Sequence, residues 1–91
     1  MFEFHWTDAS EAHIARHGVN PEEVEQATER PFYTMPGRGG TTLLFGQAHS
    51  GRYLLVVISG SGDGRWHVVT ARPMTEAERR VFKKKANDHD Q

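Results

Sequence analysis

The stretch HVVTARPMTEAERRVFKKK, residues 67–85, changes from one kind of structure to another within a few residues. Its first part is the end of an apolar run and predicts a strand. Thr75 and Glu78 then form the T-x-x-E pattern of a capping box, which predicts a helix that ends near Ala86. Arg72 therefore stands where a buried strand gives way to a helix, and the role of this arginine is the central question about the protein.

Three strands are expected upstream of that helix. They cover 41–47, 52–59 and 65–72, and the second of them, RYLLVVIS, is apolar almost throughout. Such a run is typical of a central strand that is buried on both faces. The segment SGSGDG at 59–64 predicts a tight turn between the last two strands. A shorter strand is expected at 32–34, so the second half of the chain forms a series of hairpins.

The first part of the chain predicts one strand and two short helices. Apolar and polar residues alternate over 2–6, which is the period of a half-buried strand. A helix is expected at 9–17, because N-cap residues precede it and Gly18 follows it. A second helix is expected at 21–29, because it opens with an Asn-Pro pair that supplies an N-cap and an N1 proline.

With the short strand at 32–34 left aside, the predicted order of elements is β-α-α-β-β-β-α, which indicates an α+β fold. We expect a small antiparallel meander sheet with two N-terminal helices and one C-terminal helix. Ninety-one residues suffice for one modest core, so 1–91 is predicted to be a single domain. The polar end of the chain, 87–91, is expected to fray.

Composition narrows the classes of protein that fit. The chain has no cysteine, which excludes disulfides and thiolate metal sites and fits a reducing compartment. No apolar run approaches the ~18 residues of a membrane span, and the N-terminus has neither part of a signal peptide. We therefore expect a cytoplasmic protein with no membrane partner and no cofactor.

Charge is distributed unevenly along the chain, although the net charge is only -1. Residues 1–30 carry seven acidic and two basic residues, whereas 31–91 carry five acidic and nine basic ones. One surface of the fold is therefore expected to be basic enough to meet a polyanion. The run Lys83-Lys84-Lys85 has a second interpretation, as a solvated helix end that the helix dipole favours.

Arg52 and Arg72 are the strongest candidates for an anion site. A symmetric hairpin centred on Gly62 places them opposite each other on neighbouring strands, where like charges destabilise a sheet. A bound phosphate would remove that penalty, because guanidinium groups grip phosphate at two points. The alternative is that both arginines lean outwards and pair with Glu76 or Glu78.

Two further patterns have both a functional and a structural interpretation. His13 and His17 lie one helical turn apart with His5 on the preceding strand, which is a spacing that a metal ion could use, but no acidic or cysteine ligand accompanies them. Tyr53 and Trp66 could stack on nucleic-acid bases, although aromatic residues in strands more often belong to a core.

Three segments together resemble the BrnT-like family of type II toxins: FEFHW at 2–6, HIARHGVNPEEVEQA at 13–27, and GRYLLVVISG with HVVTARPMTEAERR between 51 and 80. The resemblance implies a compact RelE-like fold and a toxin that cleaves RNA and inhibits translation and growth. It also implies a ribbon-helix-helix antitoxin encoded nearby, through which alone the toxin would contact DNA. A homodimer is possible for such a chain.

The resemblance also implies which residues carry the activity. Its catalytic positions fall on Arg52, Arg72, Glu78, Arg79 and His17. Metal-independent RNA cleavage uses the 2′-OH of the substrate as nucleophile, and the enzyme supplies a base and positive charge for the phosphorane. The expected RNA-binding residues are Arg38, Arg80, Lys83 and Lys84.

The identity of the base stays open at this point. Glu78, His17 and His49 are the candidates, but Glu78 also has a structural task as a capping residue, and His17 suits a helix C-terminus. A second function is compatible with the same fold, namely a non-catalytic domain that binds RNA or protein. In either case we expect apolar residues such as Val24 and Phe32 to be exposed and covered by a partner.

Overall fold

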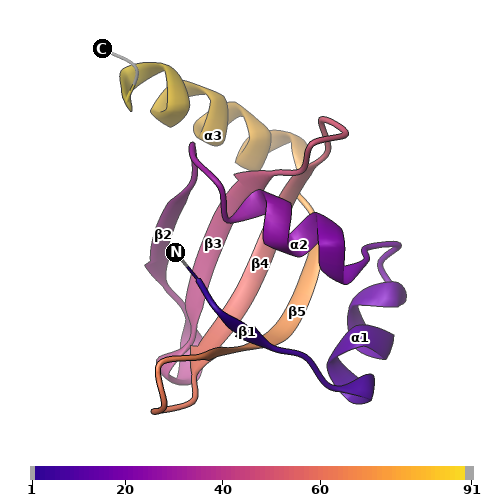
Figure 1. The fold of residues 1–91 in the computed structure, drawn as a ribbon. Helices are drawn as coiled ribbons and strands as arrows, with labels where there is room; N and C mark the ends of the chain where they lie inside the picture. Colours follow the sequence, from indigo (N-terminus) through magenta and orange to yellow (C-terminus); the bar gives the residue numbers. More distant parts are fainter. Residues whose placement is uncertain (1, 90–91) are drawn as a thin grey trace.

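The structure is a computed structural model that describes the backbone of residues 2–89 and the side chains of 2–86. Secondary structure follows the predicted order, and the short strand expected at 32–34 is present as a further strand, β2 (Figure 1). One turn of 3-10 helix, η1, was not predicted. The elements are β1 (Phe4–His5), α1 (Asp8–Ala15), α2 (Pro21–Ala27), β2 (Tyr33–Pro36), η1 (Arg38–Gly40), β3 (Thr42–Gln47), β4 (Tyr53–Gly60), β5 (Trp66–Pro73) and α3 (Glu76–His89). None of the helices in the described part of the chain is long and apolar enough to cross a membrane.

The five strands form one sheet in the order β1-β5-β4-β3-β2. Strands β2 to β5 are consecutive antiparallel neighbours, as a meander requires, so the α+β prediction is confirmed. The prediction of a purely antiparallel sheet was wrong, because β1 lies parallel to β5 and pairs Phe4 with Trp66. No hairpin joins β1 to β5, so no turn imposes an antiparallel direction on it.

Each of the first two helices begins with a reciprocal capping box. Thr7 and Ser10 exchange hydrogen bonds at the start of α1, and Asn20 and Glu23 do so at the start of α2. Both helices end two residues before the predicted positions. Helix α3 is longer than predicted and runs to His89, so the first part of the expected frayed tail is helical, while 90–91 lie outside the described residues.

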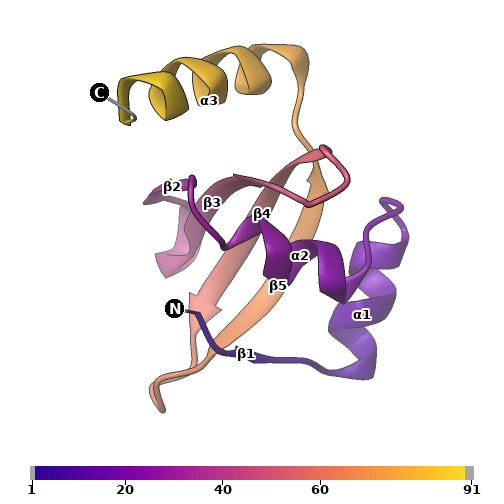
Figure 2. The same ribbon diagram turned by 45° about the horizontal axis from the view of Figure 1, so that its top comes forward.

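Side chains pack on both faces of the sheet, but one face has a much larger buried cluster than the other. One face and the helices α1 and α2 share a cluster of eleven buried residues: Ile14, Val19, Val24, Ala27, Leu44, Ala48, Leu54, Val56, Ile58, Val68 and Ala71. The other face and α3 share only four: Phe45, Leu55, Met74 and Phe82. Figures 1 and 2 show α3 on the opposite side of the sheet from α1 and α2.

Helix α2 approaches the sheet so closely that β3 needs a glycine there. A Cβ atom on Gly46 would overlap the carbonyl oxygen of Ala27, the last residue of α2. This tight packing buries Val24 completely, so the expectation that Val24 is exposed was wrong. Phe32, the other residue in that expectation, is half-buried and packs beside the larger cluster.

Candidate nucleic-acid interface

Arg52 and Arg72 do not face each other across the β4–β5 hairpin. Gly60 pairs with Trp66 at the turn, and a bulge near Val57 shifts the register again, so that Leu55 is the residue opposite Arg72. The predicted pairing was therefore wrong by several positions. Because successive side chains alternate between faces, Arg72 and Leu55 lie on the α3 face while Arg52 lies on the face of α1 and α2.

Arg52 is held by contacts to the N-terminal helices. Its Nη1 donates to the carbonyl oxygen of Gly18 at 2.8 Å and to the two carboxylate oxygens of Glu23 at 3.1 and 3.0 Å. His17 is exposed next to Gly18 on the same side of the sheet. Arg52 and His17 are therefore neighbours of each other, but the sheet separates them from the other predicted catalytic residues.

Arg72 grips the carboxylate of Glu78 with both terminal nitrogens. Nη1 donates to Oε1 at 2.8 Å and Nη2 donates to Oε2 at 2.9 Å, which is the two-point geometry of a guanidinium and a carboxylate. Thus Arg72 pairs with Glu78, as the structural interpretation predicts for this arginine, while Arg52 pairs with Glu23 instead of an acidic residue of α3.

Glu78 is also the capping residue that the sequence predicts. Its Oε1 accepts from the Thr75 backbone N–H at 2.8 Å, and its own N–H donates to the Thr75 hydroxyl at 3.2 Å. The hydrogen bonds from Arg72 have the largest effect on the pKa of Glu78 and lower it; burial opposes them, and the hydrogen bonds with Thr75 lower the pKa further. The same contact raises the pKa of Arg72. Glu78 is therefore an ionised but weakly basic carboxylate in this arrangement.

A row of side chains crosses the α3 face from β2 to β5. The register places Tyr33, Phe45, Leu55 and Arg72 side by side on β2, β3, β4 and β5. Tyr33 stacks on Phe45 with ring centroids 4.7 Å apart. Burial, and then the negative charge of Glu78, raise the pKa of Tyr33. Tyr33 therefore keeps its proton and is a neutral hydrogen-bond donor on this face.

Two lysines of α3 lie over the tyrosines of this face. The Lys83 Nζ is 5.3 Å from the centroid of the Tyr53 ring, and the Lys85 Nζ is 5.1 Å from that of Tyr33. Tyr53 is half-buried and packs against Phe82, so it belongs both to the core and to the surface. A hollow of about 270 Å³ lies beside this pair, lined by Pro31, Gln47, Tyr53, Phe82, Lys83 and Ala86.

The remaining predicted residues are only partly brought together. Arg79 precedes Lys83 by one turn of α3, so the two lie on the same side of the helix. Arg80 forms an exposed ion pair with Glu76 at 3.6 Å. Lys84 is exposed on α3. Arg38 lies in η1 and lines a different hollow from the one that Lys83 lines.

The geometry supports neither a metal site at the histidines nor base stacking by Trp66. Among the described residues, no three His, Asp or Glu side chains gather as a metal ion would require. His13 and His17 are 6.2 Å apart between ring centroids, while His5 packs against His67. Trp66 packs on Phe2 beside the larger cluster, as the core interpretation predicts.

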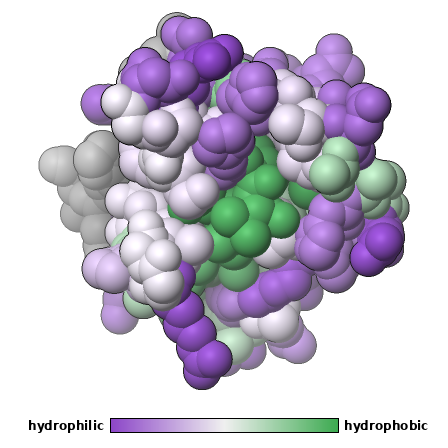
Figure 3. Space-filling view, turned by 90° about the horizontal axis from the view of Figure 1, so that it is seen from below, coloured by the Kyte–Doolittle hydropathy of each residue, from purple (hydrophilic) through white to green (hydrophobic). Residues whose placement is uncertain are grey.

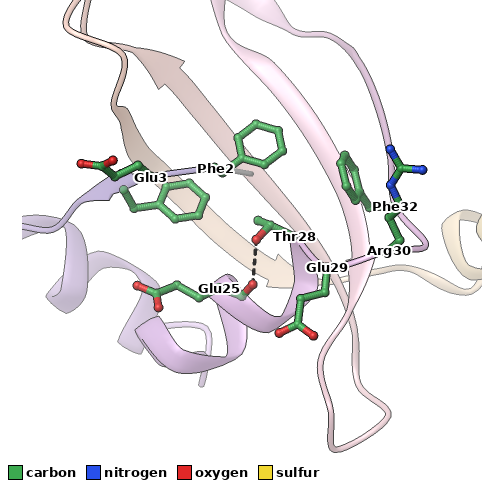
Figure 4. Close-up of a pocket in the computed structure, with 8 residues that line it drawn as sticks. Phe2, Glu3, Glu25, Thr28, Glu29, Arg30 and Phe32 are labelled. Atoms are coloured by element: carbon green, nitrogen blue, oxygen red, sulfur yellow. Dashed lines mark hydrogen bonds between the residues drawn. The ribbon is translucent and has the colours of Figure 1, made fainter.

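The larger hollow of about 720 Å³ lies near the N-terminus and is acidic (Figure 4). It is lined by Phe2, Glu3, Phe4, Glu25, Thr28, Glu29, Arg30 and Phe32. Three carboxylates and one guanidinium leave it negative, which is the wrong sign for a phosphate. The cationic α3 face is therefore the better candidate for contact with a nucleic acid.

Sequence reasoning missed Tyr33 and Lys85 as residues of this face. Tyr33 sits in a strand of four residues, and a strand that short gives no periodic signal for the face it occupies. Lys85 was one of three consecutive lysines, and only the packing of α3 shows which of them lies over a ring. Both positions depend on tertiary structure, namely on the register of β2 against β3 and on how α3 crosses the sheet.

No protein-family model matches the chain, and no curated protein matches it.

Proposed function

We propose that this protein is an RNA-cleaving toxin of the BrnT-like type, with a RelE-like fold, and that RNA binds on the α3 face. The observation that carries the proposal is the Arg72–Glu78 pair at the β5–α3 junction, on the same face as two tyrosines covered by lysines. Aromatic rings and cations in one surface are what a single-stranded nucleic acid needs for its bases and phosphates. The antitoxin of such a toxin would be a ribbon-helix-helix protein encoded nearby.

In this proposal a substrate phosphate replaces Glu78 as the partner of Arg72. A phosphate offers the same two-point geometry as a carboxylate, and Arg72 remains 36% exposed at its side chain, so an anion can reach it. The bond from Arg72 is the largest cause of the lowered pKa of Glu78. When Arg72 turns to the phosphate, that cause disappears and Glu78 becomes a stronger base.

The reaction then needs no group from outside the chain and the substrate. Glu78 accepts the proton of the 2′-OH, the 2′ oxygen forms a bond to phosphorus, and Arg72 stabilises the charge on the phosphorane. The P–O5′ bond breaks, and Tyr33, whose phenol is protonated, gives its proton to the leaving 5′ oxygen. The products are a 2′,3′-cyclic phosphate and a 5′-hydroxyl end, and water returns both residues to their starting protonation states.

A second function is favoured by one specific observation. Glu78 already accepts three hydrogen bonds, two from Arg72 and one from Thr75, and such a carboxylate is a poor base. If this pair stays closed, the α3 face binds RNA or a protein without cleaving anything. The two functions differ in whether Arg72 has to change partner, and replacement of Arg72 tests this directly.

The test uses the purified Arg72→Lys variant with two versions of one RNA oligonucleotide. Lysine keeps the charge but loses the two-point contact, so we expect cleavage of the unmodified RNA to fall by about 10²–10³-fold. Binding of a fully 2′-O-methylated RNA should change only a few-fold, since Arg79 and Lys83 still contact phosphates. Equal and small losses in both measurements would support the binding function instead.

Two variants serve as controls. Arg52→Lys makes the same exchange on the opposite face and should leave RNA cleavage near its original rate. Glu78→Gln retains a side chain that can complete the capping box, so it should fold, bind RNA and yet cleave much more slowly. A loss of cleavage in Arg52→Lys as large as in Arg72→Lys would contradict a site on the α3 face.

A further inference from the structure

The α3 face of the sheet has a second row of side chains that α3 does not cover. Met35, Leu43 and Val57 are direct neighbours in the register of β2, β3 and β4. Val69 lies beside them on β5, where it is the extra residue of the bulge. This uncovered row is about 7 Å along the strands from the row that ends in Arg72.

Three residues of the uncovered row, Leu43, Val57 and Val69, line a shallow apolar groove, and Met35 pairs with Leu43 beside it. The groove has a volume of about 680 Å³ and is lined by Pro36, Gly37, Arg38, Thr41, Leu43, Val57 and Val69. Figure 3 shows the molecule from below the view of Figure 1, with a hydrophobic area at the centre and hydrophilic side chains around it. An apolar area that is hollowed and rimmed by polar groups is typical of a binding surface.

The exposed large hydrophobic residues of the described chain all belong to this region. They are Met35, Val69 and Val81, each between 46% and 47% exposed. Lys83 lines the hollow on the far side of α3, and Val81 is about 200° away from Lys83 around the helix. Val81 therefore faces the groove, so that α3 and the sheet form two walls of one apolar corner.

The charges at the rim of the groove are positive. Arg38 lines the groove and forms no ion pair with any side chain that the structure describes. Lys85 lies over Tyr33, which is two residues from Met35 on the same face of β2. An occupant of this groove therefore needs apolar side chains towards the sheet and acidic side chains towards its rim.

We infer that the groove binds an amphipathic, acidic helix of a partner protein, which lies across the strands beside α3. The row spans about 14 Å from β2 to β5, a length that a helix of about ten residues covers. A second copy of this chain fits less well, because two basic rims would meet. RNA fits less well too, since aliphatic side chains offer no ring on which a base can stack.

A helix bound in the groove would also affect the proposed RNA cleavage. A helix in the uncovered row would lie directly beside Arg72 and Tyr33, and would block the approach of RNA to them. This consequence rests on the proposed function, but the binding of the helix does not. The two inferences therefore fail separately and can be tested with different variants.

Three synthetic helices of about 14 residues serve as probes, with one shared stripe of leucines and a polar face made of Glu, Gln or Lys. We expect the Glu helix to bind the full-length protein at least about tenfold more tightly than the Gln helix, and the Lys helix to bind least. Val69→Asp should weaken the Glu helix by about tenfold or more, because it places a carboxylate in the apolar contact.

Ala15→Asp is the matched control, since it adds the same carboxylate at an exposed position of α1 on the other face. Val69→Asp should still bind 2′-O-methylated RNA like the original protein. The inference is overturned if no helix binds below about 1 mM, or if Val69→Asp leaves the binding of the Glu helix unchanged. It is also overturned if Val69→Asp abolishes RNA binding, or if the protein forms a dimer that Val69→Asp dissociates.

Discussion

On both faces of the sheet, a glutamate at the start of a helix pairs with an arginine at the end of a strand. On one face Glu23 completes the capping box of α2 and accepts hydrogen bonds from Arg52, which directly precedes β4. On the other face Glu78 completes the capping box of α3 and accepts from Arg72, which lies near the end of β5. In both places one glutamate links the start of a helix to an arginine at a strand end.

The packing behind these two pairs is different. Helices α1 and α2 rest on a cluster of eleven buried residues, whereas α3 rests on four. Each arginine also donates to one backbone carbonyl, but Arg52 reaches that of Gly18, far away in the chain, whereas Arg72 reaches only that of the next residue, Pro73. The one contact that links Arg72 to α3 is therefore its pair with Glu78. The comparison teaches that burial secures one face, and that the other, which holds the candidate site, depends more on a single ion pair.

The largest expected effect is on the well-packed face. Gly46→Ala would push a methyl group into the backbone oxygen of Ala27, so we expect it to destabilise the protein by about 3 kcal/mol. Gly60→Ala is the matched control, because its added methyl group would lie 3.8 Å from its nearest neighbour, the Trp66 ring. Urea denaturation of both variants measures the difference. Equal stabilities would refute the close approach of α2 to β3.

A smaller effect should separate the two glutamates. Glu78→Ala removes a capping side chain and a two-point ion pair, and we expect the amides of α3 to open about 2 kcal/mol more easily. Glu23→Ala should cost α2 about 1 kcal/mol, because the larger cluster still holds that helix in place. Native-state hydrogen exchange measures each helix separately. A larger loss in α2 than in α3 would reverse the proposed contrast.

The smallest expected effect is a loss of stability of α3 in acid, caused by Glu78. The pKa of Glu78 is lowered in the folded protein, so this group adds stability above its unfolded pKa of about 4.3. That contribution is lost as the pH falls through the lower, folded pKa. We therefore expect exchange protection of α3 to decrease below pH ~4, and Glu78→Gln to lack this decrease. An acid transition of equal size in Glu78→Gln would show that another group is responsible.

Much of the local structure could be predicted, because its causes lie within a few residues of one another. The capping box Thr75–Glu78 and the N-cap Asn20 are visible as sequence patterns, and both are formed. The α+β order follows from periodicity and turn residues in the same way. Of the candidate site, the sequence predicts Arg72, Glu78 and Lys83, since these stand in or beside patterns that are themselves local.

The sequence by itself determined where helices and strands begin, and that Arg72 stands at a strand–helix junction. Only the tertiary structure decided which residues meet across the sheet. A one-residue change in register moves a side chain to the other face, so a bulge near Val57 was enough to separate Arg52 from Arg72. The burial of Val24 and the exposure of Val69 have the same origin, because both depend on which faces the helices cover, and that is fixed by packing between residues far apart in the chain.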